Sequence, residues 1–291
     1  MNNDDHNTTD GNSCAILRKT DDKTEPKDNV ARMVTGRCAN EYKMNHKFRG
    51  LALIFGHEHF DVANLQNRIE TNVDTKNLTE ALMKLDFCVR AFKDLSHKEV
   101  MDKIKETVAM DHTEHDCILI AVLSYGECDL IYAKDTYYRM DDLWNAFTAD
   151  KCPTLAGKPK LFIVEANRGR KRDKGYRMSG QTQTDSDSPS NYRIPIHADF
   201  LVAFSTIPNH CTWSDYIKGS WFIYSLCQEL SISGRKMDLL MLLTFVGQRV
   251  AVDFETYDEG YKQITCTMST LTRIVYFDDH KIETARNSCS K

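Results

Sequence analysis

The stretch Phe162-Ile-Val-Glu-Ala-Asn-Arg-Gly169 indicates both the fold and the place to look for a site. The apolar run from Leu161 to Val164 is long enough for one buried strand, and it stops at Glu165-Ala-Asn167. In an open parallel sheet, ligands bind at the carboxyl ends of the strands. This strand end is therefore the first candidate site. It offers a carboxylic acid and an amide but no nucleophile.

Apolar runs and amphipathic segments alternate on both sides of this strand. Strands are predicted at residues 50–56, 87–95, 117–123, 161–164, 200–207 and 263–277. Helices are predicted to begin near Thr71, Ser96, Asp141, Ser220 and Met237, with side-chain capping at the first three. Such alternation with short links predicts an α/β fold with a mostly parallel sheet. The last strand lies near the C-terminus, which favours a sheet edge that pairs with another chain.

Composition indicates one large globular domain with tails. The chain has 291 residues and a net charge of -4, which gives no reason to expect binding to nucleic acid or to an anionic membrane. No apolar run of about 18 residues predicts a membrane span, and the N-terminus does not resemble a secretory signal. The ten cysteines form no CxxC pair, so we expect a reducing, cytoplasmic location without disulfides, metal or cofactor. Residues 1–45 are polar and aperiodic, typical of a disordered leader.

Several further segments resemble the caspases, and most closely the insect effector caspases. They are His46-Lys-Phe-Arg-Gly-Leu-Ala-Leu-Ile-Phe, Gly157-Lys-Pro-Lys-Leu-Phe, Ile194-Pro-Ile-His-Ala-Asp-Phe-Leu, Gly219-Ser-Trp-Phe and Leu271-Thr-Arg. The resemblance covers roughly residues 45–280. It implies a caspase-like central sheet, mostly parallel and six-stranded, flanked by helices. It also implies a short prodomain (1–45), a large-subunit-like region (46–185) with a polar intersubunit loop from about residue 170, and a small-subunit-like region (186–291).

The resemblance also implies that the catalytic pair is lost. The caspase motif Q-A-C-[RQG]-G is matched here by Glu165-Ala-Asn-Arg-Gly169, and the motif Ser-His-Gly-Glu by Ser124-Tyr-Gly-Glu127. Asn167 then occupies the cysteine position and Tyr125 the histidine position, with Gly126 at the oxyanion donor. Thiolate proteolysis needs an activated nucleophile and a base that titrates near neutrality. An amide has no proton that ionises near neutral pH, and a phenol with a pKa of about 10 is seldom a base at pH 7.

The specificity pocket of the family is altered as well. Arg68 matches the first arginine that holds the substrate aspartate, whereas Glu165 replaces a glutamine and Ser214 the second arginine. Trp213 is retained, and Cys211 stands where the family has an aromatic residue. We expect Glu165 to pair with Arg68 and to repel an incoming carboxylate, because a mispaired buried charge is costly. A purely structural ion pair is the alternative.

Two features predict regulation by contact with other chains. Thr182-Gln-Thr-Asp185 resembles the intersubunit cleavage site of effector caspases, and Asp10 and Asp28 are weaker candidates for prodomain removal. The last strand resembles the strand through which caspase protomers join. The residues expected to contact a partner there are Ile264, Cys266, Met268 and Thr270.

These observations favour a catalytically inactive caspase homologue that regulates apoptosis by binding an active effector caspase, as a heterodimer or as a bait. The sequence leaves open whether it activates or inhibits that partner, and whether it forms homodimers. One alternative is a residual cysteine protease that uses displaced residues, with Cys128 or the neighbours His210 and Cys211 as candidates. Another is a decoy that sequesters caspase inhibitor proteins.

Overall fold

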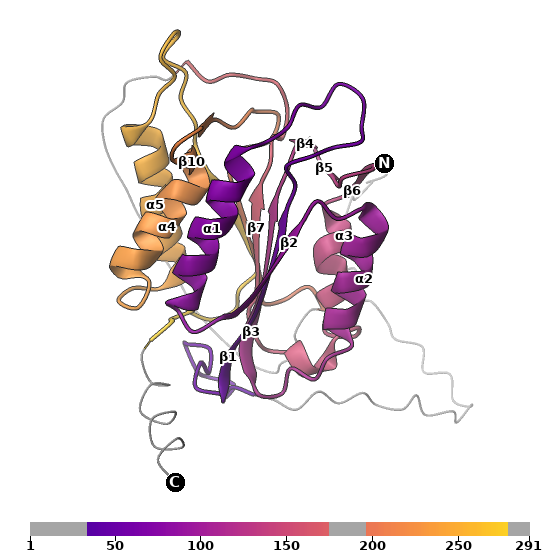
Figure 1. The fold of residues 1–291 in the computed structure, drawn as a ribbon. Coiled ribbons are helices and arrows are strands. Elements are labelled where there is room, and N and C mark those ends of the chain that lie inside the picture. The colour runs from indigo at the N-terminus through magenta and orange to yellow at the C-terminus, as the bar shows by residue number, and fades with distance from the viewer. Residues whose placement is uncertain (1–33, 175–195, 279–291) are drawn as a thin grey trace, which may run out of the picture. The chain divides into compact units, whose positions relative to one another are not determined.

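A six-stranded sheet organises the computed structural model, which describes residues 34–174 and 196–278. The strand order is β11-β8-β7-β3-β1-β2 (Figure 1). Neighbouring strands are parallel except β11, which runs antiparallel to β8. The strands are β1 (Phe48–Gly56), β2 (Cys88–Lys93), β3 (His115–Leu123), β7 (Lys160–Glu165), β8 (Phe200–Phe204) and β11 (Cys266–Ser269). The predicted fold class, α/β with a mostly parallel six-stranded sheet, is confirmed.

Helices cover both faces of this sheet (Figure 1). One face carries α1 (Glu70–Met83), α4 (Trp221–Ser233) and α5 (Leu239–Asp253), and the other carries α2 (His97–Val108) and α3 (Asp141–Trp144). The central strands are apolar throughout because successive residues point to opposite buried faces. In β1, Ala52 and Ile54 pack under the first layer of helices, and Leu53 and Phe55 under the second.

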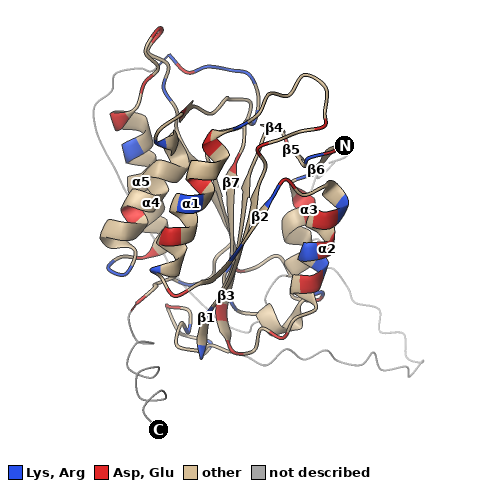
Figure 2. Ribbon diagram, viewed as in Figure 1, with Lys and Arg blue, Asp and Glu red and all other residues tan. Residues whose placement is uncertain are grey.

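The remaining elements are short. A small antiparallel sheet consists of β4 (Gly126–Glu127), β5 (Leu130–Tyr132) and β6 (Tyr137–Arg139), and a second of β9 (Ser214–Asp215) and β10 (Gly219–Ser220). Two 3₁₀ turns, η1 (Asn145–Phe147) and η2 (Pro153–Leu155), precede β7. Acidic and basic residues are interspersed on the helices, while the strands carry few of either (Figure 2). None of the helices within the described ranges is long and apolar enough to cross a bilayer.

Local capping signals were correct for one helix and wrong for two. Ser96 and Glu99 form the predicted capping box at the start of α2. In α1 no side chain caps the first turn, because the helix begins at Glu70 with Ile69 at the cap position; the Thr71 hydroxyl lies inside the helix and donates to His57 O (3.2 Å). Asp141 is the first residue of α3 rather than its cap, and its carboxylate accepts from Arg139 (3.0 Å).

The last strand is much shorter than predicted. β11 ends at Ser269, and Ile264 and Thr270 lie outside it, although it does form an edge of the sheet. Beyond it the chain leaves the sheet because Val275 and Phe277 are buried in the core under α1, α4 and α5. β8 is also shorter than predicted, since it ends at Phe204 rather than at residue 207.

Candidate functional site

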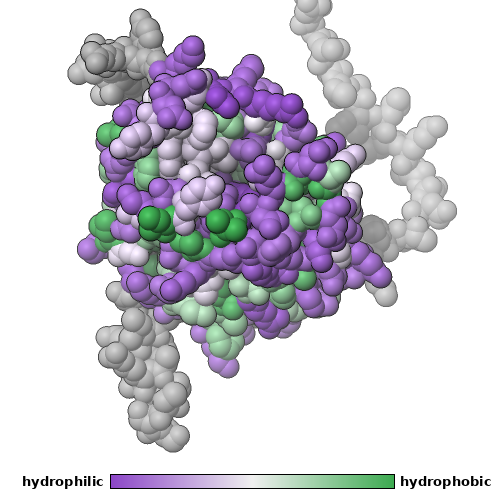
Figure 3. All heavy atoms as spheres, turned by 45° about the horizontal axis from the view of Figure 1, so that its top comes forward, coloured by the Kyte–Doolittle hydropathy of each residue, from purple (hydrophilic) through white to green (hydrophobic). Residues whose placement is uncertain are grey.

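The carboxyl ends of β3 and β7 meet, and they bring Tyr125 and Asn167 together. Leu123 pairs with Glu165 in the sheet register, and each candidate residue lies two positions further on. Gly126 packs against this junction so closely that a Cβ atom there would lie 2.7 Å from Asn167 O. Only glycine avoids that overlap. Figure 3 turns this end of the sheet toward the viewer, where hydrophilic surface surrounds separate hydrophobic patches.

The carboxamide of Asn167 is already engaged by its own chain. Its Oδ1 accepts hydrogen bonds from Thr212 N (2.7 Å) and Thr212 Oγ1 (2.8 Å). Arg168 N donates to His210 O (3.0 Å), so consecutive residues after β7 are tied to the same loop. The amide therefore positions the loop that carries Trp213. It has no proton that a base could remove to make a nucleophile.

The phenol of Tyr125 lies in an aromatic and cationic environment. Its ring contacts Phe60 (5.2 Å between centroids), and the guanidinium of Arg68 lies 5.3 Å from the ring centroid. Burial raises the pKa of Tyr125 above its ordinary value of 10. The side chain is therefore neutral at physiological pH and supplies no base.

Arg68 is enclosed by groups of its own chain. Its guanidinium donates to Ser124 O and to Glu70 Oε1 (3.4 Å) and lies 3.7 Å from Glu165 Oε1. The residue is only 4% exposed. Two of its five N–H donors are used in these hydrogen bonds, and its burial restricts the access of an external carboxylate to the others.

Glu165 lies within ion-pair distance of Arg68, but its charge state differs from the expectation. Burial raises the pKa of Glu165 to about 8; Arg68 opposes this shift and Asp74 adds to it. Neither carboxyl oxygen has a hydrogen bond of good geometry with a described residue, although the side chains of Ser220 and Thr212 lower the pKa in part. The side chain is thus mostly protonated at pH 7, because 3.7 Å without a hydrogen bond does not offset full burial. The predicted proximity of Glu165 to Arg68 is thus found, and the repulsion of a carboxylate by Glu165 stays a prediction that its raised pKa would weaken.

Two acidic residues that the sequence analysis did not select complete this cluster. Glu70 accepts from Ser214 Oγ (3.3 Å) as well as from Arg68. Asp74 accepts from Ser220 N (2.9 Å), and burial raises the pKa of Asp74 to about 6. Glu70 and Asp74 are four residues apart and therefore share one side of α1. Two acidic residues at this spacing, directly after Arg68, were the sequence signal that could have identified them as part of the cluster.

The other pocket residues lie in the loop that follows β8. The ring of Trp213 stacks on Tyr261 (5.9 Å between centroids), and the guanidinium of Arg172 lies 5.7 Å from the Trp213 ring. Burial raises the pKa of Cys211, which disfavours a thiolate. Asp185 lies outside the described residues, as do Asp10 and Asp28.

Among the described residues, no histidine forms a hydrogen bond with Cys128 or Cys211, the two candidate nucleophiles. Cys128 is exposed on the turn between β4 and β5. The nitrogens of the buried His57 have no hydrogen-bond partner within residues 34–174 and 196–278. His210 Nδ1 contacts Pro208 O (3.0 Å) and not the neighbouring Cys211. The described geometry therefore assembles no Cys–His pair from these candidates.

Comparison with known proteins gives a consistent result. A family model described as "Caspase domain" matches residues 49–276. The chain is 51% identical over 264 residues to Caspase drICE of Drosophila melanogaster, covering 88% of this chain and 78% of the relative. It is 50% identical over 254 residues to Caspase-1 of Spodoptera frugiperda, covering 85% of each. The crystal structure of the latter superimposes with a TM-score of 0.81 at 48% identity, covering 86% of this chain and 98% of that one. The chain belongs to the caspase family.

Proposed function

We propose that this chain is a non-catalytic caspase homologue that regulates apoptosis by pairing with an active effector caspase. The proposal rests on the side chains that follow the carboxyl ends of β7 and β3. A carboxamide and a phenol follow β7 and β3, and the structure gives both of them contacts within their own chain. By the family resemblance, Asn167 and Tyr125 stand where a caspase has its cysteine and histidine. Neither side chain performs thiolate chemistry.

The enclosure of Arg68 supports the same proposal independently of the catalytic pair. A substrate aspartate would have to displace contacts with Ser124, Glu70 and Glu165 to reach the guanidinium. Because the cluster is almost fully buried, each displaced contact would leave a polar group unpaired. We therefore expect very weak recognition of Asp-containing peptides.

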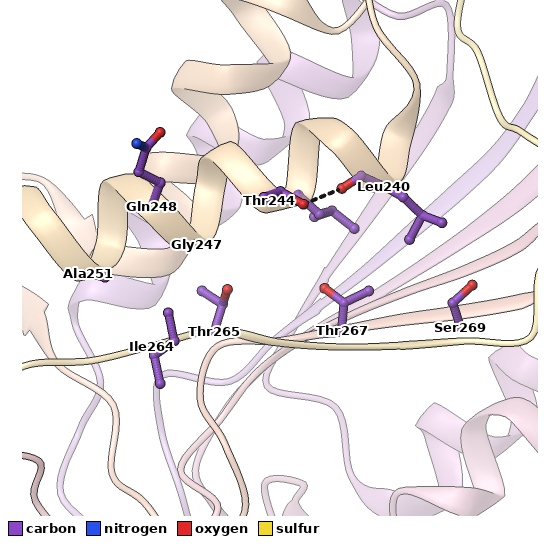
Figure 4. Close-up of a pocket in the computed structure, with 10 residues that line it drawn as sticks. Leu240, Thr244, Gly247, Gln248, Ala251, Ile264, Thr265, Thr267 and Ser269 are labelled. Atoms are coloured by element: carbon purple, nitrogen blue, oxygen red, sulfur yellow. Dashed lines mark hydrogen bonds between the residues drawn. The ribbon is translucent and has the colours of Figure 1, made fainter. Parts of the chain in front are cut away.

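The edge of the sheet at β11 supplies a surface for pairing. A groove of about 550 Å³ lies between β11 and α5. Figure 4 shows Thr265, Thr267 and Ser269 pointing toward α5 across it. The exposed hydrophobic residues along α5 and β11 are Leu240, Met241, Phe245, Val252 and Met268. An open strand edge beside exposed apolar side chains suits strand addition by a second chain.

Pairing of this kind can regulate without chemistry in this chain. A partner whose loops exchange between active and inactive arrangements is shifted by any contact that differs between the two states. The direction of that shift is a matter for measurement. Cleavage at Asp185, which would separate the proposed large-subunit-like region (46–185) from the small-subunit-like region (186–291), would be a second level of control.

The test titrates the purified chain into an active effector caspase that hydrolyses an Asp-ending peptide, with the chain alone as the blank. A concentration-dependent change in rate supports the proposal. Hydrolysis in the blank, or a rate that stays constant at saturating chain, contradicts it. Gel analysis for cleavage at Asp185 separates a regulator from a competing substrate, and sedimentation of the chain alone measures homodimer formation.

A single substitution at the strand edge sharpens this test. Thr270 N donates to Phe200 O and Thr270 O accepts from Asp199 N, so the backbone at this position faces β8. Alternate residues of a strand face opposite sides, and the N–H of Thr267 therefore points outward. Thr267→Pro removes that N–H without breaking the pairing with β8 and should abolish the effect on the partner. Thr267→Val keeps the N–H and is the matched control.

A further inference from the structure

A cluster of metal-ligand side chains lies at the ends of β1 and β2. Glu58 and His59 are the second and third residues after β1, and Asp94 is the first residue after β2. Asp94 N donates to Gly56 O (2.9 Å), so the parallel register places the two strand ends side by side. The end of β2 can be followed in Figure 2, where blue changes to red. The fold therefore brings together residues 35 or more positions apart, a spacing that no sequence motif indicates.

The backbone fixes two of these side chains relative to each other. Asp94 Oδ1 accepts from Glu58 N (2.6 Å) and His59 N (3.0 Å), which leaves Oδ2 to face the imidazole. His59 Nδ1 lies 2.9 Å from Asp94 Oδ2 and 3.7 Å from Glu58 Oε2. One imidazole nitrogen is thus directed at two carboxylates. The three candidate ligand atoms all lie within 4.8 Å of one another.

Two of these separations are close to the spacing of ligand atoms around zinc. Zn²⁺ binds imidazole nitrogen and carboxylate oxygen at about 2.0–2.2 Å, which in a tetrahedron places ligand atoms about 3.3–3.6 Å apart. The measured separations of 2.9 and 3.7 Å lie on either side of that range. The mixed nitrogen and oxygen set favours Zn²⁺ over Mg²⁺ or Ca²⁺, which take oxygen ligands.

We propose that Glu58, His59 and Asp94 form a binding site for Zn²⁺. The ion replaces the proton that His59 Nδ1 shares with Asp94. The side chain of His59 is 51% exposed, which leaves the ion an entry path and a position for water. This site is separate from Tyr125 and Asn167, and the proposal does not depend on the pairing function.

Lys93 of the same chain would compete with a zinc ion for the carboxylate of Glu58. Its ammonium contacts Glu58 Oε2 and also donates to Asn72 Oδ1 (3.0 Å). The Lys93 side chain is 56% exposed and can therefore move into solvent when an ion binds. Its removal should accordingly strengthen zinc binding.

Zinc binding would also act on the segment that leads to Arg68. Arg68 N donates to Glu58 O (2.9 Å), so one hydrogen bond links the proposed site to the enclosed arginine. A ligand that binds only the folded chain raises its thermal midpoint. This gives a readout that is independent of any activity.

The test is calorimetric titration of ZnCl₂ into the metal-free full chain, in a buffer without phosphate and with a reductant that does not bind zinc. The wild type is expected to bind one more ion than His59→Ala, or to bind at least about tenfold more tightly. Lys93→Met should bind several-fold more tightly than the wild type. His197→Ala, a change at another exposed histidine, is the matched control and should titrate like the wild type.

Two results would overturn the proposal. One is a wild-type chain that takes up no zinc at micromolar concentrations. The other is a His59→Ala chain with the stoichiometry and affinity of the wild type, in which case any bound zinc lies on the cysteines. Both outcomes would leave the cluster as a proton-bridged network of ion pairs. An anomalous scattering peak between Glu58, His59 and Asp94 in zinc-soaked crystals would support the site directly.

Discussion

Replacement of Glu165 by glutamine tests how the buried cluster around Arg68 is held together. Glu165 is fully buried, and no hydrogen bond to either carboxyl oxygen is formed within the described residues. Glutamine has nearly the same shape but cannot ionise. The substitution therefore removes one titrating group and leaves the packing of β7 almost unchanged. The expected result is a change in the pH dependence of stability and not in the fold.

The sign and size of the effect follow from the pKa of Glu165. Its ordinary value is 4.5, and burial raises the pKa to about 8. A proton bound more tightly in the folded state supplies stability that is complete below about pH 4.5 and is lost as the pH rises through about 8. At about 1.4 kcal/mol per pH unit, this loss is at most about 5 kcal/mol. Asp74, with a pKa of about 6, acts in the same direction but is common to both proteins.

The assay is urea unfolding of wild type and Glu165→Gln at pH 5.5, 7 and 9. The variant should be more stable than the wild type by about 1.4 kcal/mol at pH 5.5, one pH unit above the ordinary pKa of Glu165, and by several kcal/mol at pH 9. Glu80→Gln, a change of an exposed glutamate on α1, controls for the loss of a surface charge. Parallel curves for wild type and Glu165→Gln would show that Glu165 stays ionised, in a true ion pair with Arg68, and would refute the reasoning.

Three further predictions concern the site, its processing and the scaffold. The double variant Tyr125→His plus Asn167→Cys should hydrolyse Asp-ending peptides with a kcat/KM about two orders of magnitude below that of Caspase-1 of Spodoptera frugiperda. A loss of about 3 kcal/mol in the binding of the substrate carboxylate gives that factor. Comparable kcat/KM values would contradict the enclosure of the pocket. Asp185→Ala should abolish cleavage into two fragments by an active caspase, as seen on a denaturing gel, and fragments of unchanged size would place the cut elsewhere. Ser96→Ala should lower the free energy of unfolding by about 1 kcal/mol through loss of the capping box at α2, so an unchanged urea midpoint would be inconsistent with that contact.

The parts of the fold that the sequence predicted well are those in which local pattern and burial agree. The apolar run from Leu161 to Val164 is a central strand because both of its faces are covered, so continuous hydrophobicity is its proper signal. Val100 and Ile104 of α2 are buried at helical spacing, as their periodicity indicates. The topological rule that sites gather at carboxyl strand ends pointed to Asn167, whereas Tyr125 was selected from the caspase motif; their roles stay predictions.

The predictions failed where a side chain finds a partner far away in the sequence. The residues from Thr71 to Asp74 follow a helix-capping pattern. The Thr71 hydroxyl, however, donates to His57 O, and the Asp74 carboxylate accepts from Ser220 N. Residues 270–277 alternate like a strand, yet the burial of Val275 and Phe277 under the helices takes the chain out of the sheet. The raised pKa of Glu165 depends on complete burial, a quantity that sequence spacing does not contain. Local sequence patterns predict the helices and strands, whereas the ionisation of buried side chains depends on contacts between residues that are distant in sequence.

The enclosed site has a consequence for how a partner would be affected. A binding pocket with open polar groups is costly until its ligand arrives, so the order of its loops depends on ligand. Here Asn167, Glu70 and Asp74 accept hydrogen bonds from residues of the same chain. The donors are Thr212, Ser214 and Ser220, so these contacts hold the loop over residues 212–220. Gly219 has a φ of 87° and passes so close to Asp74 that a Cβ would lie 2.1 Å from its Oδ1, which shows how tightly this loop is fixed. In the proposed heterodimer, we therefore expect no binding of an aspartate in the pocket of this chain. An aspartate-directed inhibitor added to the pair should consequently titrate the partner's site alone, with a stoichiometry of one per heterodimer.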